Sequence, residues 1–308
     1  MYGKDKLLIT GGLGNLGSWL THYFSDKFEV YVLSKNLTHK LDCDYKVIQC
    51  DITDINELRD KLDITFNYCI HTASYNEFFH DNYSKKALLV NALGTRNLIE
   101  VLKDTKIKNF IYLSTFHVYG LNSGIITEDS QLNPKNDYAS THLFAEYYLK
   151  QFYNTDMFPS VIFRLTNSYG SPKYKDSSKW YLILNDLVKS AYYDNKIVLK
   201  GNGKARRDFI WMGDVCSIIE KSFNFDDNRV FNLSSKKTYS MLELAQKVQE
   251  VYMGRYSKKI NIEINRDDDT ELLNLLVDNS KLKKEINFEF IDYFDKEIKS
   301  IFNLLESK

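Results

Sequence analysis

Several features that mark particular protein classes are scarce in this chain or absent from it. Its 308 residues include three prolines, and no Pro/Gly/Ser-rich stretch separates one part from another. Lysine plus arginine and aspartate plus glutamate both total 41, so the chain lacks the basic surplus of a nucleic-acid or membrane-surface binder. No apolar run approaches the roughly 18 residues that cross a bilayer. These absences predict a globular protein with no nucleic-acid or membrane partner.

The four cysteines are informative by their arrangement. Cys43, Cys50, Cys69 and Cys216 are scattered, with no C-x-x-C pair and no histidine at a metal-ligand spacing. Three of them lie in or beside apolar, strand-like stretches, which indicates buried thiols in a reducing compartment. The first residues have no signal-peptide anatomy. We therefore expect a cytoplasmic protein without disulfides, structural zinc or another metal site.

What is present is a regular alternation of short apolar runs with amphipathic segments. With 44% apolar and 27% charged residues, the composition is that of an ordinary globular chain. Short apolar runs suit strands buried on both faces, and helices between such strands require a parallel sheet. Strands are expected at 6–10, 30–33, 47–48, 68–70, 110–113 and 160–164, with helices at 16–24, 55–62, 88–102 and 138–152. This order predicts an α/β fold with a Rossmann-type doubly wound parallel sheet.

Beyond about residue 166 the pattern loosens. Helices are expected at 180–193, at 240–252 and near 291–305, with a strand at 260–264 and a short mixed segment at 208–215. We expect residues 1–165 to form a dinucleotide-binding domain and residues 166–308 a smaller mixed α/β lobe that binds substrate. Without a linker, the smaller lobe should pack on the first domain, and their segments are free to interleave.

Glycine is used sparingly, thirteen times in all, yet four glycines fall between residues 11 and 17. Gly11, Gly14 and Gly17 form a G-x-x-G-x-x-G spacing after an apolar strand and before an amphipathic helix. Glycine permits the tight turn, lets the backbone approach a pyrophosphate and lets the helix pack closely on the strand. The N–H groups at the start of the helix then face the phosphates. This placement predicts a dinucleotide site.

The end of the second strand bears on the choice of cofactor. An acidic residue there would accept hydrogen bonds from the adenosine ribose, but the chain has Ser34, Lys35 and Asn36. A lysine ammonium can meet a 2′-phosphate, and a charged hydrogen bond of about 1.5–3 kcal/mol gives about tenfold discrimination or more. This favours NADP over NAD and leaves both open, because Lys35 is nearly as well explained as a solvated surface charge.

Further motifs follow the glycine turn in order along nearly the whole chain. They are Thr10–Gly17, Asp51-Ile52, His71–Ser74, Asn91–Leu98, Leu113–Gly120, Asn133-Pro134 with Tyr138–His142, Arg164 with Asn167, Tyr169 and Gly170, and Arg207–Ile210 with Asp214-Val215. In this order the chain resembles the extended short-chain dehydrogenase/reductase family that acts on nucleotide sugars, often labelled NAD-dependent epimerase/dehydratase. The resemblance implies an enzyme that moves a hydride between a nicotinamide and a carbon, C4 in our interpretation, of a nucleotide-diphosphate sugar.

The resemblance also implies roles for individual residues. Tyr138 would exchange a proton with the sugar hydroxyl, Thr115 would hydrogen-bond the same oxygen, and His142 stands at the family's lysine position. Arg207 and Asn167 would bind the diphosphate, because a guanidinium fork suits phosphate oxygens, with Ser114 as a further substrate contact. Together with Ser34 and Lys35, the residues expected to bind the cofactor are Gly11, Gly14, Asn15, Leu16, Gly17, Asp51, Ile52, Thr72, Ala73, Ser74, Asn91, Tyr138 and His142.

The first departure from the family pattern is at position 142, where histidine replaces the lysine that lowers the tyrosine pKa. An unperturbed tyrosine titrates near pH 10, so about one in a thousand is ionised at pH 7. Forming the phenolate at that pH therefore costs a free-energy gap of about 4 kcal/mol. A mostly neutral histidine closes less of that gap. Oxidation of a sugar needs the phenolate as a base, whereas reduction of a ketosugar needs only the phenol as an acid, so the change favours reduction. The alternative is a degenerate position in a protein with little activity.

The second departure concerns the residues directly after the active-site threonine. Family members that eliminate water carry an acidic residue or an Asp-Glu pair there, which protonates the leaving hydroxyl. This chain has Phe116 and His117. Phenylalanine cannot transfer a proton, and histidine can do so in principle only if its side chain faces the sugar. The sequence therefore disfavours a 4,6-dehydratase.

We accordingly expect a 4-keto-sugar nucleotide reductase. Two alternatives stay open: a nucleotide-sugar 4-epimerase that uses tightly bound NAD, and a catalytically weakened NAD(P)-binding protein that serves as a sensor or scaffold. The family resemblance also suggests a homodimer through the helices near residues 85–103 and 138–152. Their many apolar residues permit a four-helix seam.

Overall fold

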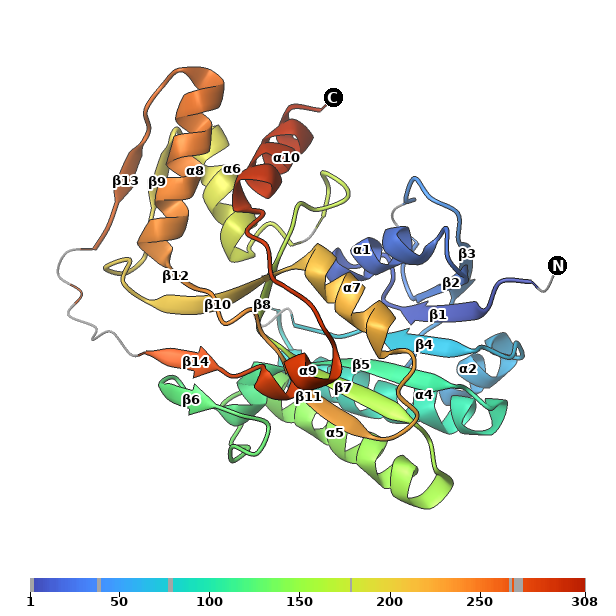
Figure 1. Ribbon diagram of the computed structural model, residues 1–308. Coiled ribbons are helices and arrows are strands. Elements are labelled where there is room, and N and C mark those ends of the chain that lie inside the picture. Colours follow the sequence, from blue (N-terminus) through green and yellow to red (C-terminus); the bar gives the residue numbers. More distant parts are fainter. Residues whose placement is uncertain are drawn as a thin grey trace.

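A large parallel sheet forms the centre of the computed structural model, which describes residues 3–37, 40–76, 80–177, 179–265, 268 and 274–307. The sheet has seven strands in the order β11-β7-β5-β4-β1-β2-β3, and every neighbouring pair is parallel (Figure 1). Its strands are β1 (Lys6–Thr10), β2 (Glu29–Ser34), β3 (Lys46–Gln49), β4 (Tyr68–His71), β5 (Asn109–Thr115), β7 (Ser160–Leu165) and β11 (Arg229–Leu233). This architecture confirms the predicted Rossmann-type α/β fold.

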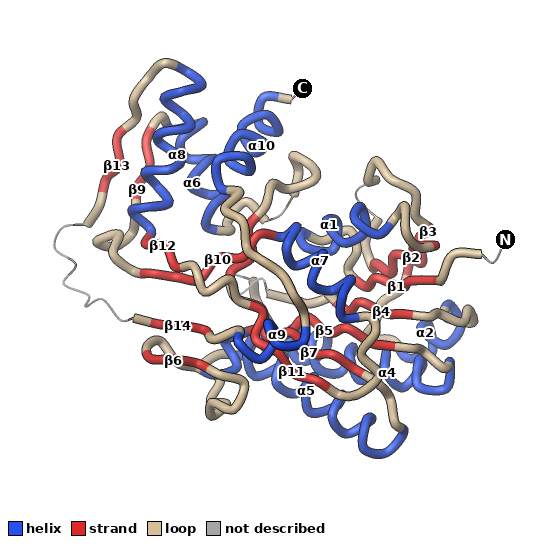
Figure 2. The backbone as a smooth tube through the Cα atoms, viewed as in Figure 1, coloured by secondary structure: helices blue, strands red, loops and turns tan. Residues whose placement is uncertain are grey.

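Helices cover both faces of this sheet because its strands bury alternate side chains on opposite sides. Leu7 and Ile9 of β1 belong to one core cluster, which α1 (Asn15–Phe24), α7 (Met212–Ser222) and α9 (Ser280–Glu285) complete. Leu8 of the same strand belongs to the cluster on the other face. That second cluster is completed by α2 (Ile55–Lys61), α4 (Thr95–Leu102) and α5 (Asp137–Asp156). Figure 2 shows the two helical layers with the strands between them.

The helix expected at 88–102 starts earlier and changes its winding on the way. It runs from α3 (Tyr83–Ala87) through a π-helical segment, η1 (Leu88–Gly94), into α4. The backbone at both ends of η1 keeps right-handed helical angles, so the three pieces are continuous. η1 packs against α5, the helix that carries Tyr138 and His142.

The smaller lobe has its own core beside the carboxyl ends of the large sheet. Its helices are α6 (Ile183–Asp194), α8 (Met241–Tyr256) and α10 (Phe294–Glu306), and its strands pair as β12-β10-β8 and β13-β9. These strands are β8 (Asn167–Tyr169), β9 (Lys196–Val198), β10 (Arg206–Trp211), β12 (Thr238–Ser240) and β13 (Asn261–Glu263). Val188, Val248 and Ile298 each come from a different helix and are fully buried together.

Three elements beyond residue 165 return to the large sheet. Strand β11 pairs with β7 at its edge, α7 packs beside α1 on one face, and α9 packs against β11. The segment expected to be short and mixed at 208–215 is the end of β10 followed directly by the start of α7. Val215, Cys216 and Ile219 supply the apolar stripe of α7, and most of that stripe lies beyond residue 215.

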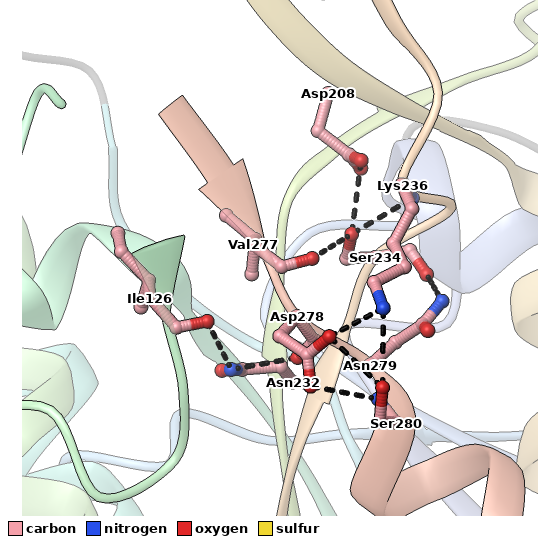
Figure 3. A network of polar contacts seen from close by, with 9 residues as sticks. All are labelled: Ile126, Asp208, Asn232, Ser234, Lys236, Val277, Asp278, Asn279 and Ser280. Carbon is pink, nitrogen blue, oxygen red and sulfur yellow. Dashed lines mark hydrogen bonds and ion pairs between the residues drawn. The ribbon is translucent and has the colours of Figure 1, made fainter. Parts of the chain in front are cut away.

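A network of polar contacts ties the two parts together (Figure 3). The buried carboxylate of Asp208 in β10 accepts hydrogen bonds from the hydroxyl groups of Thr166 and Ser234 at 2.5 and 2.9 Å. The amide of Asn279 donates to the carbonyl of Ser234 at 2.6 Å, and the amide of Asn232 donates to the carbonyl of Asp278 at 3.1 Å. These bonds join β11 to the paired strands β6 (Gly124–Ile126) and β14 (Leu275–Val277), so β10 is held in place over the sheet edge.

Among the described residues, no helix combines the length and the apolar character that crossing a membrane requires. The four cysteines are free thiols, and Cys50, Cys69 and Cys216 are buried. Within the same part of the chain, no group of three or more histidine, cysteine or carboxylate side chains gathers as a metal site would require.

Candidate active site

The glycine turn between β1 and α1 is shaped for close backbone approach. Gly11 has a φ of +66°, and a Cβ there would come within 2.9 Å of the backbone of Ala73. A Cβ on Gly17 would collide with the carbonyl oxygen of Gly11. Helix α1 then begins at Asn15 without a side-chain cap on its first N–H groups. The start of α1 therefore presents unpaired donors and a positive dipole end, as an anionic phosphate requires.

A cavity of about 1180 Å³ runs from this turn to the smaller lobe. Its lining contains nearly every residue predicted to bind cofactor: Gly11, Gly14, Asn15, Leu16, Gly17, Ser34, Lys35, Asp51, Ile52, Thr72, Ala73, Ser74, Tyr138 and His142. These residues come from the carboxyl ends of β1, β2, β3 and β4, from the segments that follow those strands, and from the helices α1 and α5. A cavity of this volume has room for a dinucleotide and a second ligand.

Asn91 is placed behind the lining and not within it. Its side chain is 1% exposed, and its Oδ1 accepts a hydrogen bond from the backbone N–H of Tyr75 at 2.6 Å. Its Nδ2 donates to the carbonyl of Tyr75 at 3.1 Å and to the hydroxyl of Thr141 at 3.0 Å. Asn91 therefore fixes the segment after Ser74 against α5, and its contact with a cofactor can only be indirect.

Lys35 and Asp51 lie together at the end of the cavity beside β2. The Nζ atom of Lys35 is 2.5 Å from Oδ2 of Asp51. Burial alone would raise the pKa of Asp51, but hydrogen bonds from Lys35 and Thr53 lower it. The Lys35 side chain is 69% exposed. A lysine that is paired at its tip and still accessible is able to turn from Asp51 to a phosphate.

Tyr138 and Thr115 meet at the centre of the cavity. Thr115 is the last residue of β5, and Tyr138 follows Asp137 in the first turn of α5, which Asn136 caps through the N–H of Ala139. Burial raises the pKa of Tyr138 to about 12, and a hydrogen bond with Thr115 opposes that rise. The phenol is therefore the stable form of Tyr138 at neutral pH.

His142 lies one helical turn after Tyr138, with the ring centres 4.5 Å apart. It is 2% exposed, and its Nδ1 is 2.7 Å from the hydroxyl oxygen of Tyr112. Its Nε2 is buried and has no hydrogen-bond partner among the residues that the structure describes. Burial lowers the pKa of His142 to about 3, with a smaller effect from His117, so the imidazole is neutral.

The residues present fit a dinucleotide. The glycine cradle has space that a Cβ would fill. His142 lines the cavity, and its buried Nε2 has no partner among the described residues. A bound nicotinamide would supply the site with a hydride acceptor or donor. Gly11, Gly14 and Gly17 would hold its pyrophosphate, and His142 would contact its ribose.

Ser114 lines the cavity, but its hydroxyl is used elsewhere. It donates to Oε1 of Glu146 at 2.5 Å, and Glu146 in turn pairs with Arg164. Ser114 was expected to contact the substrate, but its hydroxyl instead joins the Glu146–Arg164 cluster behind the cavity. Thr115, by contrast, accepts the N–H of His117 at 3.2 Å and also hydrogen-bonds Tyr138 within the cavity.

At the substrate end, the structure separates the two residues expected to bind a diphosphate. Asn167 lines the cavity, and its Nδ2 donates to the carbonyl of Asp208 at 2.9 Å. Arg207 lies outside the lining and is exposed on β10, two residues before Phe209, which does line it. The guanidinium is still close enough to lower the pKa of His117, after burial. Its place is the rim of the cavity.

Several lining residues gave no signal in the sequence. They are Asn76, Tyr83, Lys179, Tyr181 and Asn185. The Nζ of Lys179 donates to Oδ1 of Asn76 at 3.1 Å and to the Tyr181 hydroxyl at 3.3 Å. This lysine comes from the polar loop before α6, and no local spacing distinguishes it from the chain's other lysines.

The sequence profile of the NAD dependent epimerase/dehydratase family matches residues 7–234. The chain belongs to this family. The predicted resemblance is confirmed, and with it an NAD-dependent enzyme built around the glycine turn of β1 and α1.

Individual family members are similar at moderate identity. The dTDP-D-glucose 4,6-dehydratase of Dictyostelium discoideum is 30% identical over 79% of this chain, which spans 61% of that relative's length. The GDP-6-deoxy-D-talose 4-dehydrogenase of Aggregatibacter actinomycetemcomitans is 24% identical, with 90% of both chains covered. Among solved structures, the UDP-glucose 4-epimerase of Thermotoga maritima with UDP-glucose superimposes with a TM-score of 0.83 at 19% identity, covering 97% of this chain and 98% of that one. This last likeness shows the fold.

Proposed function

We propose that this family member is an NAD(P)-dependent oxidoreductase that reduces the C4 carbonyl of a nucleotide-linked 4-keto sugar. One observation carries the proposal: the Tyr138 phenol stands beside Thr115 in the cavity with no cationic group at position 142. Residues 1–165 would hold most of the dinucleotide, and residues 166–308 most of the sugar nucleotide. Asn167 would lie along the diphosphate, with Arg207 at the rim.

The protonation state of Tyr138 favours the reductive direction. With a pKa of about 12, the residue is a phenol at neutral pH, and His142 is too weak a base to carry the positive charge that would lower it. A ketone that receives hydride becomes an alkoxide and needs a proton at once. Tyr138 gives that proton while Thr115 holds the oxygen by a hydrogen bond, and the phenolate recovers its proton from water.

The same cavity gives no support to elimination of water. The carboxylates of its described lining are Asp51, which pairs with Lys35, and Asp176 in the loop before α6. Directly after Thr115 come Phe116 and His117, whose rings lie 4.2 Å apart. Burial lowers the pKa of His117, as does Arg207, so a neutral imidazole stands where an acid would be needed. We infer that this chain departs from its 4,6-dehydratase relatives at this step.

The names of the relatives support the substrate class. The Dictyostelium protein is named for dTDP-D-glucose, and the Aggregatibacter protein for oxidation at C4 of a GDP-linked 6-deoxy sugar. A C4 dehydrogenase and a C4 ketoreductase carry out the same hydride transfer in opposite directions. A nucleotide-diphosphate 4-keto sugar is accordingly the class of substrate to test first.

The experiment is a screen of UDP-, dTDP- and GDP-linked 4-keto sugars with NADPH and with NADH, followed by absorbance at 340 nm. We expect one ketosugar to drive cofactor oxidation. Tyr138→Phe should lower kcat by about 100-fold or more, the usual contribution of a general acid, and change NADPH affinity far less than kcat. Tyr148→Phe is the matched control, because Tyr148 lies on the same helix but packs in the core away from the cavity.

Other outcomes identify the alternatives. Protein that is purified with tightly held NAD and interconverts 4-hydroxy epimers would be an epimerase. Protein that binds cofactor without turning over any ketosugar or hydroxy sugar would be a binding protein. Either result overturns the reductase.

A further inference from the structure

A row of aromatic rings runs from the buried sheet to the cavity lining, with three rings stacked and the last one edge-on. His71 and Tyr112 are partners across β4 and β5, with ring centres 5.5 Å apart and planes inclined by 24°. Tyr112 and His142 follow at 5.8 Å and 30°, and His142 then meets Tyr138 at 4.5 Å. His71 and Tyr112 are 0% and 2% exposed. The hydrogen bonds of His71 and Tyr112 must therefore be made within the protein.

The hydrogens at the His71 end of the row can be assigned. The Thr95 hydroxyl donates to the carbonyl of Asn91 at 2.6 Å, so its oxygen accepts the Nε2–H of His71 at 2.8 Å. The Nδ1 of His71 is then bare and accepts the hydroxyl hydrogen of Thr10 at 2.5 Å. Both nitrogens of His71 are thereby satisfied, and its tautomer is fixed.

The hydroxyl of the next ring, Tyr112, hydrogen-bonds His142. The Tyr112 hydroxyl is buried, and Nδ1 of His142 lies 2.7 Å from it. The neighbouring Thr95 oxygen already accepts the hydrogen of His71 but keeps a second lone pair. The phenol hydrogen is assigned to Nδ1 of His142, which is the acceptor 2.7 Å from the Tyr112 hydroxyl. A phenol that donates to Nδ1 places the imidazole hydrogen on Nε2, a buried atom with no partner among the described residues, on a side chain that lines the cavity.

We propose that Tyr112 is a positioning residue: its hydroxyl holds His142 in the neutral Nε2–H tautomer, so that an N–H donor faces the ribose of the dinucleotide. The inference rests on the proposed place of His142 in the cofactor site, but not on the direction of reaction. A lysine at this position would present a donor in any rotamer, whereas only one nitrogen of a neutral imidazole carries hydrogen. A histidine therefore needs a neighbour that selects the nitrogen, and Tyr112 is that neighbour.

The first test reads the tautomer directly. The chain has six histidines, so protein labelled with ¹⁵N at both ring nitrogens gives a tractable NMR spectrum, in which His142→Asn identifies the signals of residue 142. We expect Nε2 to be protonated and Nδ1 to be pyridine-like in the wild-type protein, and this preference to be lost in Tyr112→Phe. A wild-type spectrum with the hydrogen on Nδ1 would overturn the inference. Because no ketosugar is present, the result is independent of whether reduction is ever observed.

The second test is cofactor affinity. Titration with NADPH should show binding about fivefold weaker for Tyr112→Phe, the effect of one lost neutral hydrogen bond. Tyr119→Phe is the matched control, because it also removes a buried hydroxyl, bonded to Asn232 at 2.6 Å, but away from the cavity. In a His142→Ala background, Tyr112→Phe should cause no further loss. Equal losses in both backgrounds, or no loss in the wild type, would contradict the proposal.

Discussion

The carboxylate of Glu146 lies 2.7 Å from Nη2 of Arg164, and each of the two side chains is at most 6% exposed. Glu146 comes from α5, four residues after His142, and Arg164 comes from β7. The pair also receives the Ser114 hydroxyl of β5, and Arg164 donates to the Tyr119 hydroxyl at 2.9 Å. A charged, fully bonded cluster therefore fixes the catalytic helix to the two strands beneath it.

Removing one partner of this pair should destabilise the protein strongly. Glu146→Ala leaves an uncompensated buried guanidinium, and we expect the free energy of unfolding to fall by about 3–5 kcal/mol in urea titrations. Glu146→Leu combined with Arg164→Met should recover most of that loss. The control is Glu263→Ala, which breaks the exposed pair with Lys196 and should cost less than about 1 kcal/mol. Similar losses at the two pairs would contradict this account.

Two buried histidines make stability depend on pH in the acid range. Burial lowers the pKa of His71 and of His142 to about 3, whereas both residues titrate near 6.5 in the unfolded chain. Between these values the unfolded chain binds more protons, so the free energy of unfolding falls as pH falls from 6.5 toward 3. Each histidine lowers the free energy of unfolding by up to about 1.4 kcal/mol for each pH unit of acidification in this range.

Urea titrations from pH 7 to pH 4 measure this dependence. His142→Gln should reduce the slope by one histidine's share, and His22→Gln, at an exposed position on α1, is the control. A slope that His142→Gln leaves unchanged would place the source of the pH dependence elsewhere.

Position 142 should also set the balance between reduction and oxidation. In the wild type, Tyr138 stays a phenol across neutral pH because its pKa is about 12, so its ionisation should not slow reduction between pH 7 and 9. His142→Lys places an ammonium beside the phenol and lowers its pKa. Oxidation of the hydroxy sugar near neutral pH should then rise more than reduction does. An unchanged or lower oxidation rate in steady-state assays, with His142→Gln as the uncharged control, would count against the proposed role.

Lys35 should decide between the two cofactors. If its ammonium leaves Asp51 for a 2′-phosphate, Lys35→Ala should weaken the binding of NADPH by about tenfold and leave the affinity for NADH nearly unchanged. The matched control is Lys46→Ala, because Lys46 pairs with Glu29 and is not part of the cavity lining. Equal affinities of the wild type for NADPH and NADH would show that Lys35 serves only Asp51.

The homodimer stays a prediction, and the surface of two helices makes it testable. Leu88 and Leu93 of η1 are 50% and 38% exposed, and Phe144 and Tyr147 of the adjoining α5 are 49% and 53% exposed. If these side chains form the seam, light scattering should give a dimer that Phe144→Lys converts to a monomer. Ile125→Lys, at a 69% exposed position on β6, should not change the mass. A monomeric wild type would contradict the seam.

Much of the molecule could be predicted from local pattern. Six strands of the large sheet and the glycine turn were readable because burial on both faces and the phosphate cradle each require particular residues at short spacing. Tyr138, Thr115 and His142 were found through family motifs, and the structure brings all three to one cavity. The strand β11 and most of α7 were missed, because neither has a pattern that distinguishes it from its neighbours until it packs on the sheet.

The sequence by itself determined the order of the elements, the cradle and the chemical groups available for proton transfer, since these depend on residues close together in the chain. Tertiary structure alone decided which groups meet. It paired Lys35 with Asp51 and turned Ser114 toward Glu146. It also set the Tyr112 hydroxyl against His142. Such contacts arise where a strand packs beneath a helix far along the chain, and no local spacing records them.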